Sequence, residues 1–330
     1  MAHSIPSGPT LPLLTGRGAE LLAQGQERVI VTGAGGWLGL ATLEMLHGLL
    51  GDLFHRRVVC FGATERRLSL RGGIDIAQHP LSALATLPAA SSVVLHLAFQ
   101  TKGAMGMPAA EYIDLNRAIG SQVADVLDRI GARAVFVASS GAAYLADSVT
   151  ASPFKRLYGS LKLEDEARFS GWGKDTGNHV VIARVFNIAG PYINNRSHYA
   201  LACFIADALA DRPIEIHATN RVYRSFVAIG ELMSIVFGTF ANPGNRVVRF
   251  DTAGDAILEM GEVAEAVALV LDHHRGIHRP PINEKLEADY YVGDGSTYHA
   301  LRQSFTAPPT TLENQICQTA DYMRDHPEAE

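Results

Sequence analysis

The sequence predicts an α/β protein built on a doubly wound parallel sheet. Short runs of β-branched residues recur through residues 28–185, and stretches with apolar residues at helical spacing lie between them. A glycine-rich turn joins the first run to the first long helical stretch. Because a strand, a helix and a further strand pack as a right-handed crossover, this alternation favours parallel strands with helices on both faces of the sheet.

The strands and helices of this domain follow one another in a regular order. Five runs have the composition of buried strands, and three stretches between them carry an apolar stripe with the period of a helix. The strands are RVIV (28–31), VVCF (58–61), VVLHLA (93–98), AVFVAS (134–139) and VVIARV (180–185). The helices are LGLATLEMLHGLL (38–50), AAEYIDLNRAIGSQVADVLDRI (109–130) and LYGSLKLEDEARF (157–169). Residues 28–185 are therefore predicted to form one domain.

The alternation becomes irregular after about residue 186. Pro, Asn and Gly cluster in the connections that follow. Further helices are expected at 199–210 and 260–274. We expect residues 186–220 and 256–330 to form a smaller, irregular α/β region at the carboxyl edge of the sheet. Segments of about 221–255 are expected to return to the first domain, and residues 1–27 to form an N-terminal extension.

Composition and charge exclude several classes of protein. Apolar residues make up 47% of the 330 residues and charged residues 19%, as in ordinary globular proteins. A net charge of -6 without a long basic run does not predict a binding surface for nucleic acid or an anionic membrane. No apolar stretch has the length of a membrane span. The three scattered cysteines, Cys60, Cys203 and Cys317, are expected to be reduced thiols, and the chain to be cytoplasmic.

The glycine-rich turn TGAGGWLG (32–39) follows the first strand directly and opens the first long helix. Gly33 permits the tight turn, Gly36 lets the backbone approach a pyrophosphate, and Gly39 allows close contact between helix and strand. The helix N-terminus offers amide groups and a positive dipole end to the phosphates. This context predicts a dinucleotide site on a Rossmann-type sheet, and the alternative is a simple packing turn.

The segment YGSLK (158–162) places Tyr158 four residues before Lys162, so the two side chains share one face of a helix. A phenol is a poor base at neutral pH, and the ammonium of Lys162 would favour its anion. Ser140 could hydrogen-bond the oxygen at a reacting carbon while Tyr158 exchanges a proton and a nicotinamide exchanges hydride. The alternative interpretation is a solvated Tyr/Lys pair and a Ser that caps a strand.

The motifs together resemble those of the extended short-chain dehydrogenase/reductases that modify nucleotide sugars, the NAD-dependent epimerase/dehydratase family. The glycines are three and three residues apart, and the motifs occur in the order of that family over about residues 28–240. They are TGAGGWLG, HLAF (96–99), VASSGAAY (137–144), YGSLK, RVFNIAGP (184–191) and RVYRSFVAIGEL (221–232).

The resemblance implies a set of site residues. Ser140, Tyr158 and Lys162 would be catalytic, with Asn116 supporting them by hydrogen bonds from mid-helix. The cofactor would contact the turn, the strand that follows and the catalytic pair, with an Asp at the adenine. The residues are Gly33, Gly36, Trp37, Leu38, Gly39, Asp75, Ile76, Leu97, Ala98, Tyr158 and Lys162.

The substrate would bind Ser140, Asn187 and Arg224, with Arg224 on its diphosphate. For each of these polar residues a plainer role stays open. Arg224 could form a surface salt bridge, Asn187 a turn, and Asn116 an exposed position on its helix.

Two departures from the family bear on the reaction and the cofactor. Dehydratases carry an Asp-Glu pair where this chain has Gly141 and Ala142, so elimination of water is disfavoured. Gly62 stands where an acid usually binds the ribose of NAD. Thr64, Arg66 or Arg67 could bind a 2′-phosphate instead, which favours NADP slightly, although Glu65 could serve the ribose of NAD.

The leading hypothesis is an NAD(P)-dependent nucleotide-sugar epimerase that acts by hydride transfer at C4, with Tyr158 as acid/base. A nucleotide-sugar 4-ketoreductase or dehydrogenase using NADP(H) is the close alternative. A reductase for another carbonyl and a non-catalytic dinucleotide sensor are more remote. The resemblance also implies a homodimer through helices 109–130 and 157–169. No metal is expected, because DHHRGIH (272–278) lacks the spacing of a known site.

Overall fold

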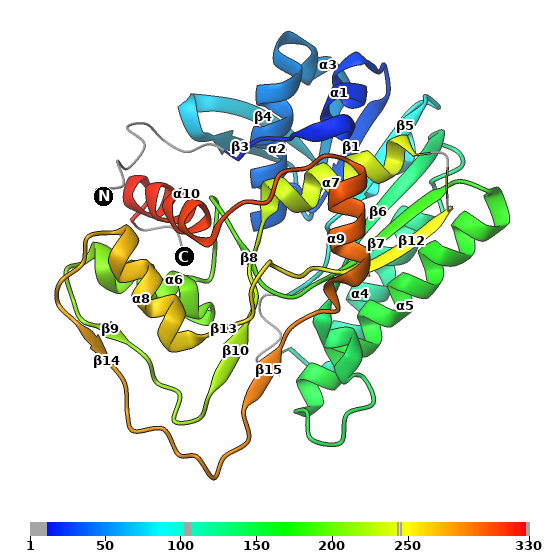
Figure 1. Ribbon diagram of the computed structural model, residues 1–330. Helices are drawn as coiled ribbons and strands as arrows, with labels where there is room; N and C mark the ends of the chain where they lie inside the picture. Colours follow the sequence, from blue (N-terminus) through cyan, green and yellow to red (C-terminus); the bar gives the residue numbers. More distant parts are fainter. Residues whose placement is uncertain (1–11, 102–106, 243, 245, 328–330) are drawn as a thin grey trace.

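The computed structural model describes residues 12–101, 107–242, 244 and 246–327. It is a mixed α/β structure around an eight-stranded sheet with the order β12-β7-β6-β5-β1-β2-β4-β3 (Figure 1). All neighbours in this sheet are parallel except β3 and β4. The strands are β1 (Arg28–Thr32), β2 (Val58–Gly62), β3 (Arg66–Leu70), β4 (Ile74–Pro80), β5 (Ser92–His96), β6 (Ala132–Ser140), β7 (His179–Val185) and β12 (Val247–Asp251). The prediction of a doubly wound, mostly parallel sheet is confirmed.

Helices cover both faces of the sheet, so its central strands are buried on both sides. Val29 and Val31 of β1 point into one hydrophobic core and Ile30 into the other, as the two-residue period of a strand requires. The first core lies under α2 (Trp37–Leu50) and α7 (Ile229–Ala241). The second lies under α4 (Ala109–Ala124) and α5 (Pro153–Thr176).

Two helices differ in length from the prediction. The helix expected at 109–130 ends at Ala124, because Val126 and Leu127 donate to carbonyls three residues back and the chain continues as tight turns. Their side chains stay buried, which explains the continued apolar spacing. α5 is longer than expected. Ser152 caps its first turn, Pro153 follows as the first helical residue, and Gly177 ends it in the left-handed region.

The second half of the chain adds three small sheets and several helices. β10 lies between β13 and β15, β11 pairs with β8, and β14 pairs with β9. The strands are β8 (Ile188–Ala189), β9 (Ile214–Glu215), β10 (Val222–Arg224), β11 (Val227–Ala228), β13 (Leu258–Glu259), β14 (Ile277–His278) and β15 (Asp289–Tyr291). The remaining helices are α1 (Gly16–Gln24), α3 (Phe54–Arg57), α6 (Ala200–Leu209), α8 (Met260–Val270), α9 (Gly295–Ser304) and α10 (Leu312–Asp325).

These elements form a region beside the large sheet. Helices α6, α8 and α10 contact one another and are grouped to the left in Figure 1. Of the segment 221–255, α7 and β12 pack with the large sheet, whereas β10 belongs to the three-stranded sheet. The domain boundary near residue 186 remains a prediction. Among the described residues, no helix combines the length and the apolar character needed to cross a membrane.

Helix α1 lies within the predicted N-terminal extension and packs against α7. The two helices approach so closely that a Cβ atom on Gly18 would lie 2.3 Å from the backbone nitrogen of Gly238. Arg57 adds a polar contact, since its buried guanidinium donates to the carbonyl oxygens of Leu22 at 2.8 Å and Glu27 at 3.0 Å. This part of the extension is therefore integrated into the fold.

Candidate functional site

A cleft of about 580 Å³ lies at the carboxyl ends of β1, β2, β5 and β6, where ligands bind in open parallel sheets. Its position is the point at which the strand order reverses, since β1 has β2 on one side and β5 on the other. Ten of the residues predicted to contact a cofactor line it. They are Gly33, Gly36, Trp37, Leu38, Gly39, Thr64, Arg66, Leu97, Tyr158 and Lys162.

The glycine-rich turn brings backbone close to the cleft. Gly33 has a φ of 71°, and a Cβ atom there would lie 2.6 Å from the backbone nitrogen of Ala98. Gly36 is the N-cap of α2, so the amide groups of the first turn point toward the cleft. A Cβ atom on Gly39 would lie 2.5 Å from the carbonyl oxygen of Ala34. The turn therefore admits only glycine at Gly33 and Gly39.

Asp75 and Ile76 do not reach the cleft, which corrects their predicted role at the adenine. β4 is parallel to β2 with Pro80 opposite Gly62, so Asp75 lies five residues before the cleft edge, about 16 Å away. Its exposed carboxylate accepts from Ser69 and Arg67, and Ile76 is buried in the core. Ala98, also predicted to contact the cofactor, is not among the lining residues of the cleft.

Gln78 lines the cleft and is not among the residues that the sequence predicts for it. Its side chain is 2% exposed, its amide nitrogen donates to the carbonyl of Thr64 at 2.8 Å, and its amide oxygen is buried with no partner. A Cβ atom on Gly62 would lie 2.3 Å from the amide carbon of Gln78. Gln78 therefore fills the space beside the position that lacks an acid. Its place in the alternating IDIAQ run is the signal that could have identified it.

The two arginines of β3 point to opposite faces of the strand. Arg66 lines the cleft, and its guanidinium approaches the carbonyl oxygen of Gly35 at 3.4 Å. Arg67 forms an ion pair with Asp75 at 3.1 Å on the far side. Only Arg66 is therefore placed to meet a phosphate in the cleft.

Tyr158 and Lys162 lie on one face of α5, at the cleft. The ammonium of Lys162 donates to the carbonyl of Ala138 at 2.9 Å and lies 3.7 Å from the centre of the Phe99 ring. Burial lowers the pKa of Lys162 to about 8, against the opposing charges of Asp165 and Glu166. This ammonium is 5.8 Å from the centre of the Tyr158 ring.

Ser140 connects Tyr158 to the second region of the protein. Burial raises the pKa of Tyr158 well above its usual value, and a hydrogen bond with Ser140 acts in the opposite direction. The hydroxyl of Ser140 accepts from the backbone of Ala142 at 3.2 Å and lies 3.5 Å from the hydroxyl of Tyr291. Tyr158 thus lies between the cleft on one side and a group of hydroxyls on the other.

Asn116 is a buried residue of α4, so an exposed position is wrong for it. Its amide oxygen accepts from the backbone of Gln100 at 2.8 Å, and its amide nitrogen donates to the carbonyl of Tyr112 at 3.0 Å. The loop that follows β5 carries Phe99 and Gln100, which both line the cleft. Asn116 therefore fixes this loop against α4.

Asn187 and Arg224 both bind protein groups on the far side of Ser140. The amide of Asn187 donates to the carbonyls of Ser225 at 3.2 Å and Tyr291 at 3.1 Å. Arg224 forms an ion pair with Asp289 at 2.7 Å and donates to the carbonyl of Tyr223 at 2.8 Å. These contacts hold β10 and β15 together, so a phosphate would have to compete with Asp289 for Arg224.

A buried ion network lies beside the end of β6, next to Ser140. Glu166 is 2% exposed; it accepts from Ser139 at 2.6 Å and forms ion pairs with Arg184 at 2.8 Å and Arg249 at 3.0 Å. Burial raises the pKa of Glu166, but the hydrogen bonds from Arg184 and Ser139 outweigh it and lower the pKa overall. The network ties α5 to β6, β7 and β12.

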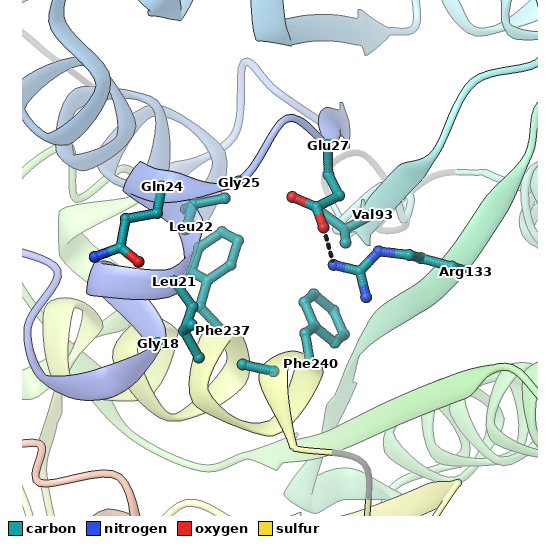
Figure 2. Close-up of a pocket in the computed structure, with 11 residues that line it drawn as sticks. Gly18, Leu21, Leu22, Gln24, Gly25, Glu27, Val93, Arg133, Phe237 and Phe240 are labelled. Atoms are coloured by element: carbon teal, nitrogen blue, oxygen red, sulfur yellow. Dashed lines mark hydrogen bonds and ion pairs between the residues drawn. The ribbon is translucent and has the colours of Figure 1, made fainter.

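A second cavity of about 400 Å³ lies at the amino ends of β5 and β6, where Val93 and Arg133 line it (Figure 2). Leu21 and Leu22 of α1 and Phe237 and Phe240 of α7 form its apolar walls. An ion pair between Glu27 and Arg133 at 2.6 Å lies at its side. None of the predicted site residues lines this second cavity.

The histidine-rich segment after α8 binds neighbouring carboxylates. His274 contacts Asp272 at 3.2 Å, and His278 contacts Glu215 at 3.1 Å. Within the described residues, no group of three or more His, Cys, Asp or Glu side chains could hold a metal ion.

Solved structures share this fold at low sequence identity. A UDP-N-acetylglucosamine 4-epimerase from Methanobrevibacter ruminantium M1, in complex with UDP-N-acetylmuramic acid, is 17% identical; the match covers 91% of this chain and 99% of that chain, with a TM-score of 0.68. A UDP-glucose 4-epimerase is 15% identical over 92% and 99% of the two chains, with a TM-score of 0.73. MoeE5, in complex with UDP-glucuronic acid and NAD, is 18% identical over 90% and 99%, with a TM-score of 0.66.

The sequence itself matches one family of proteins. No curated protein matches the chain. The model of the NAD dependent epimerase/dehydratase family matches residues 29–247, a segment that contains the glycine-rich turn, Ser140, Tyr158 and Lys162. The chain belongs to the NAD-dependent epimerase/dehydratase family.

Proposed function

We propose that the protein is an NAD(P)-dependent nucleotide-sugar epimerase that acts by hydride transfer at C4, with Tyr158 as the acid/base. The observation that carries the proposal is the position of Tyr158, between the cleft at the glycine-rich turn and the hydroxyls of Ser140 and Tyr291. Proteins of similar fold are described as 4-epimerases or as complexes with UDP-sugars, which supports a nucleotide-sugar substrate.

The cleft fits a nicotinamide dinucleotide. The turn at Gly33 and Gly36 leaves room for a pyrophosphate against the first turn of α2, and the buried amide oxygen of Gln78 has no partner within the protein. Trp37 is fixed at the cleft by donating to the carbonyl of Pro191 at 2.9 Å. When bound, the nicotinamide would take hydride from the sugar carbon and return it.

The residues of the chain would handle the proton. Tyr158 has to be ionised to take the proton of the sugar hydroxyl as the carbon is oxidised, and it gives this proton back on reduction. Burial opposes the ionisation, so the proposal requires positive charge close to the phenol. Lys162, with its lowered pKa, supplies positive charge next to this phenol. Ser140 holds the sugar oxygen, and Asn116 keeps the loop with Phe99 in place. In an epimerase the keto sugar rotates in the site between the two hydride transfers. The hydride therefore returns to the opposite face of the C4 carbonyl, which inverts the configuration at C4.

The test is to incubate the purified protein with UDP-glucose or UDP-N-acetylglucosamine and follow the C4 epimer by NMR without added cofactor. Formation of the epimer, with dinucleotide released from the denatured protein, supports the proposal. Because Gly62 replaces the ribose-binding acid, a 4-ketoreductase using NADPH is the second candidate. It would instead give no epimer and consume NADPH with a 4-keto nucleotide sugar.

Cofactor choice yields a separate prediction. We propose a preference for NADP(H), with Arg66 and Thr64 at the 2′-phosphate. Replacing Arg66 with Ala should weaken NADPH binding by roughly 10- to 100-fold, because a charged hydrogen bond is lost, and should leave NADH binding nearly unchanged. Titration of protein fluorescence gives both affinities once any retained dinucleotide has been removed. Arg67→Ala is the matched control, since Arg67 faces Asp75. Equal weakening for both dinucleotides would contradict the preference.

We also propose a cytoplasmic homodimer formed through α4 and α5. The two helices are in contact and joined by a bidentate ion pair between Arg117 and Glu164, with both bonds at 2.7 Å. Leu115 is 37% exposed on α4, an apolar side chain that a partner helix could cover. Light scattering should then give a mass of about twice the 35.5 kDa of the chain.

A further inference from the structure

Two adjacent tyrosines of β15 face opposite sides of the strand. Tyr290 is 60% exposed and stacks on Tyr223, with ring centres 4.6 Å apart and an angle of 6°. Tyr291 points the other way, and its hydroxyl lies 3.5 Å from the hydroxyl of Ser140. Tyr291 therefore joins Ser140 and Tyr158 in one cluster of side-chain hydroxyls, although it lies 133 residues after Tyr158 in the sequence.

Tyr291 is held in this position from several sides. Its ring packs on Phe186 at a centre distance of 4.8 Å, and its carbonyl accepts from Asn187 at 3.1 Å. The guanidinium of Arg224 lies 5.8 Å from the centre of its ring. Ring, backbone and strand pairing therefore fix the direction of the hydroxyl. A polar group placed so firmly is suited to a task that depends on geometry.

The ring of Phe186 that packs on Tyr291 also occupies the space beside Gly141, one of the two positions at which dehydratases carry an acid. A Cβ atom on Gly141 would lie 2.6 Å from the ring of Phe186, so no side chain fits there while Phe186 packs on Tyr291. The hydroxyl of Tyr291 is a polar group on this side of the site, 3.5 Å from the hydroxyl of Ser140. Burial raises the pKa of Tyr291, with a hydrogen bond to Ser140 acting against it, so its hydroxyl keeps its proton at neutral pH.

We propose that Tyr291 donates a hydrogen bond to the oxygen on the reacting carbon of the sugar, together with Ser140. This inference rests on the proposed function. Two hydroxyls 3.5 Å apart can both reach one acceptor at a normal distance of about 2.7 Å. As hydride adds to the carbonyl carbon, the electron pair of the C=O bond moves to oxygen and the proton of Tyr158 neutralises it. Tyr291 keeps its own proton and stabilises the charge that develops on this oxygen.

The test compares Tyr291→Phe with Tyr290→Phe. The first variant keeps the ring on Phe186 and removes only the hydroxyl, and the second removes a hydroxyl that faces away from Ser140. For Tyr291→Phe, kcat should fall by roughly 10²-fold, with a smaller change in KM and unchanged dinucleotide affinity and thermal midpoint. Tyr290→Phe should stay within about twofold of the wild type.

A double-mutant cycle with Ser140→Ala adds a readout that packing alone would not move. Because both hydroxyls would share one acceptor, the two losses should be coupled rather than additive. Equal kcat for Tyr291→Phe and Tyr290→Phe would overturn this inference and leave the epimerase proposal intact. If the wild type binds UDP-sugar without turnover, calorimetry decides: weaker binding in Tyr291→Phe alone supports the contact, and unchanged binding overturns it. A wild type that neither binds nor converts any UDP-sugar would overturn both proposals.

Discussion

Replacing Tyr158 with Phe should lower kcat by about 10²- to 10⁴-fold, the range expected when a general acid/base is removed. The proposed reaction gives the proton of the sugar hydroxyl to Tyr158, because the ammonium of Lys162 lies 5.8 Å from the centre of its ring and favours the phenolate. The measurement is the rate of epimer formation under saturating UDP-sugar. A rate within tenfold of the wild type would exclude Tyr158 as the acid/base.

The control for Tyr158→Phe is the affinity for the dinucleotide. The aromatic ring remains in the variant and keeps its edge-to-face contact with Phe99, whose centre is 5.4 Å from that of Tyr158. The fold and the cleft should therefore be preserved, and NADPH should bind within a few-fold of the wild-type affinity. Loss of binding together with loss of rate would indicate damage to the cleft instead of lost proton transfer.

Replacing Glu166 with Ala should lower the free energy of unfolding by about 3–5 kcal/mol, because Arg184 would be left buried without its counter-ion. The side chains of Glu166 and Arg184 are 2% and 14% exposed. Glu284 also pairs with an arginine, but its side chain and that of Arg221 are 70% and 45% exposed. Glu284→Ala should therefore cost only about 0–1 kcal/mol. Urea unfolding of the two variants and the wild type measures both values.

The stabilisation from Glu166 should also depend on pH. Its pKa in the folded protein lies below the ordinary value of 4.5, so the folded state binds this proton more weakly than the unfolded state does. The contribution is complete above pH 4.5 and is lost as the pH falls through the folded pKa. The difference in stability between wild type and Glu166→Ala should therefore shrink below pH 4.5. A difference that stays constant down to pH 3 would mean that packing, not charge, stabilises this site.

The large sheet could be predicted because its signals are local. Each strand is a short β-branched run, and the glycine turn links strand to helix within eight residues, 32–39. The end of α4 could not be predicted in this way. Val126, Leu127 and Ile130 keep the helical spacing and are buried, but the backbone there has already left the α-helix. The spacing of apolar residues indicates which side of a segment faces the core. It does not indicate which hydrogen bonds the backbone of that segment forms.

The parts of the site that could not be predicted depend on contacts that sequence order does not encode. The choice between Asp75 and Gln78 depends on the pairing of β4 with β2, which places Gln78 opposite Cys60 and Asp75 far from the cleft. Tyr291 reaches Ser140 only because β15 adds to β10 in parallel. Arg224 is predicted to bind a phosphate, and its ion pair with Asp289 follows only from the pairing of β10 with β15. Motifs identify the reacting groups, and strand register decides which other side chains join them.

The packing of α1 on α7 has a consequence for how the protein is made. The buried side of α1 carries Gly18, Ala19 and Leu22, and its cover is the helix Ile229–Ala241. Translation at about 5–20 residues per second needs about 10–40 s to produce the roughly 200 residues between the two helices. Of these two helices α1 leaves the ribosome first, so its buried side has to wait for its main cover until α7 has been made. During this interval the apolar side chains of α1 that pack on α7 lack that partner.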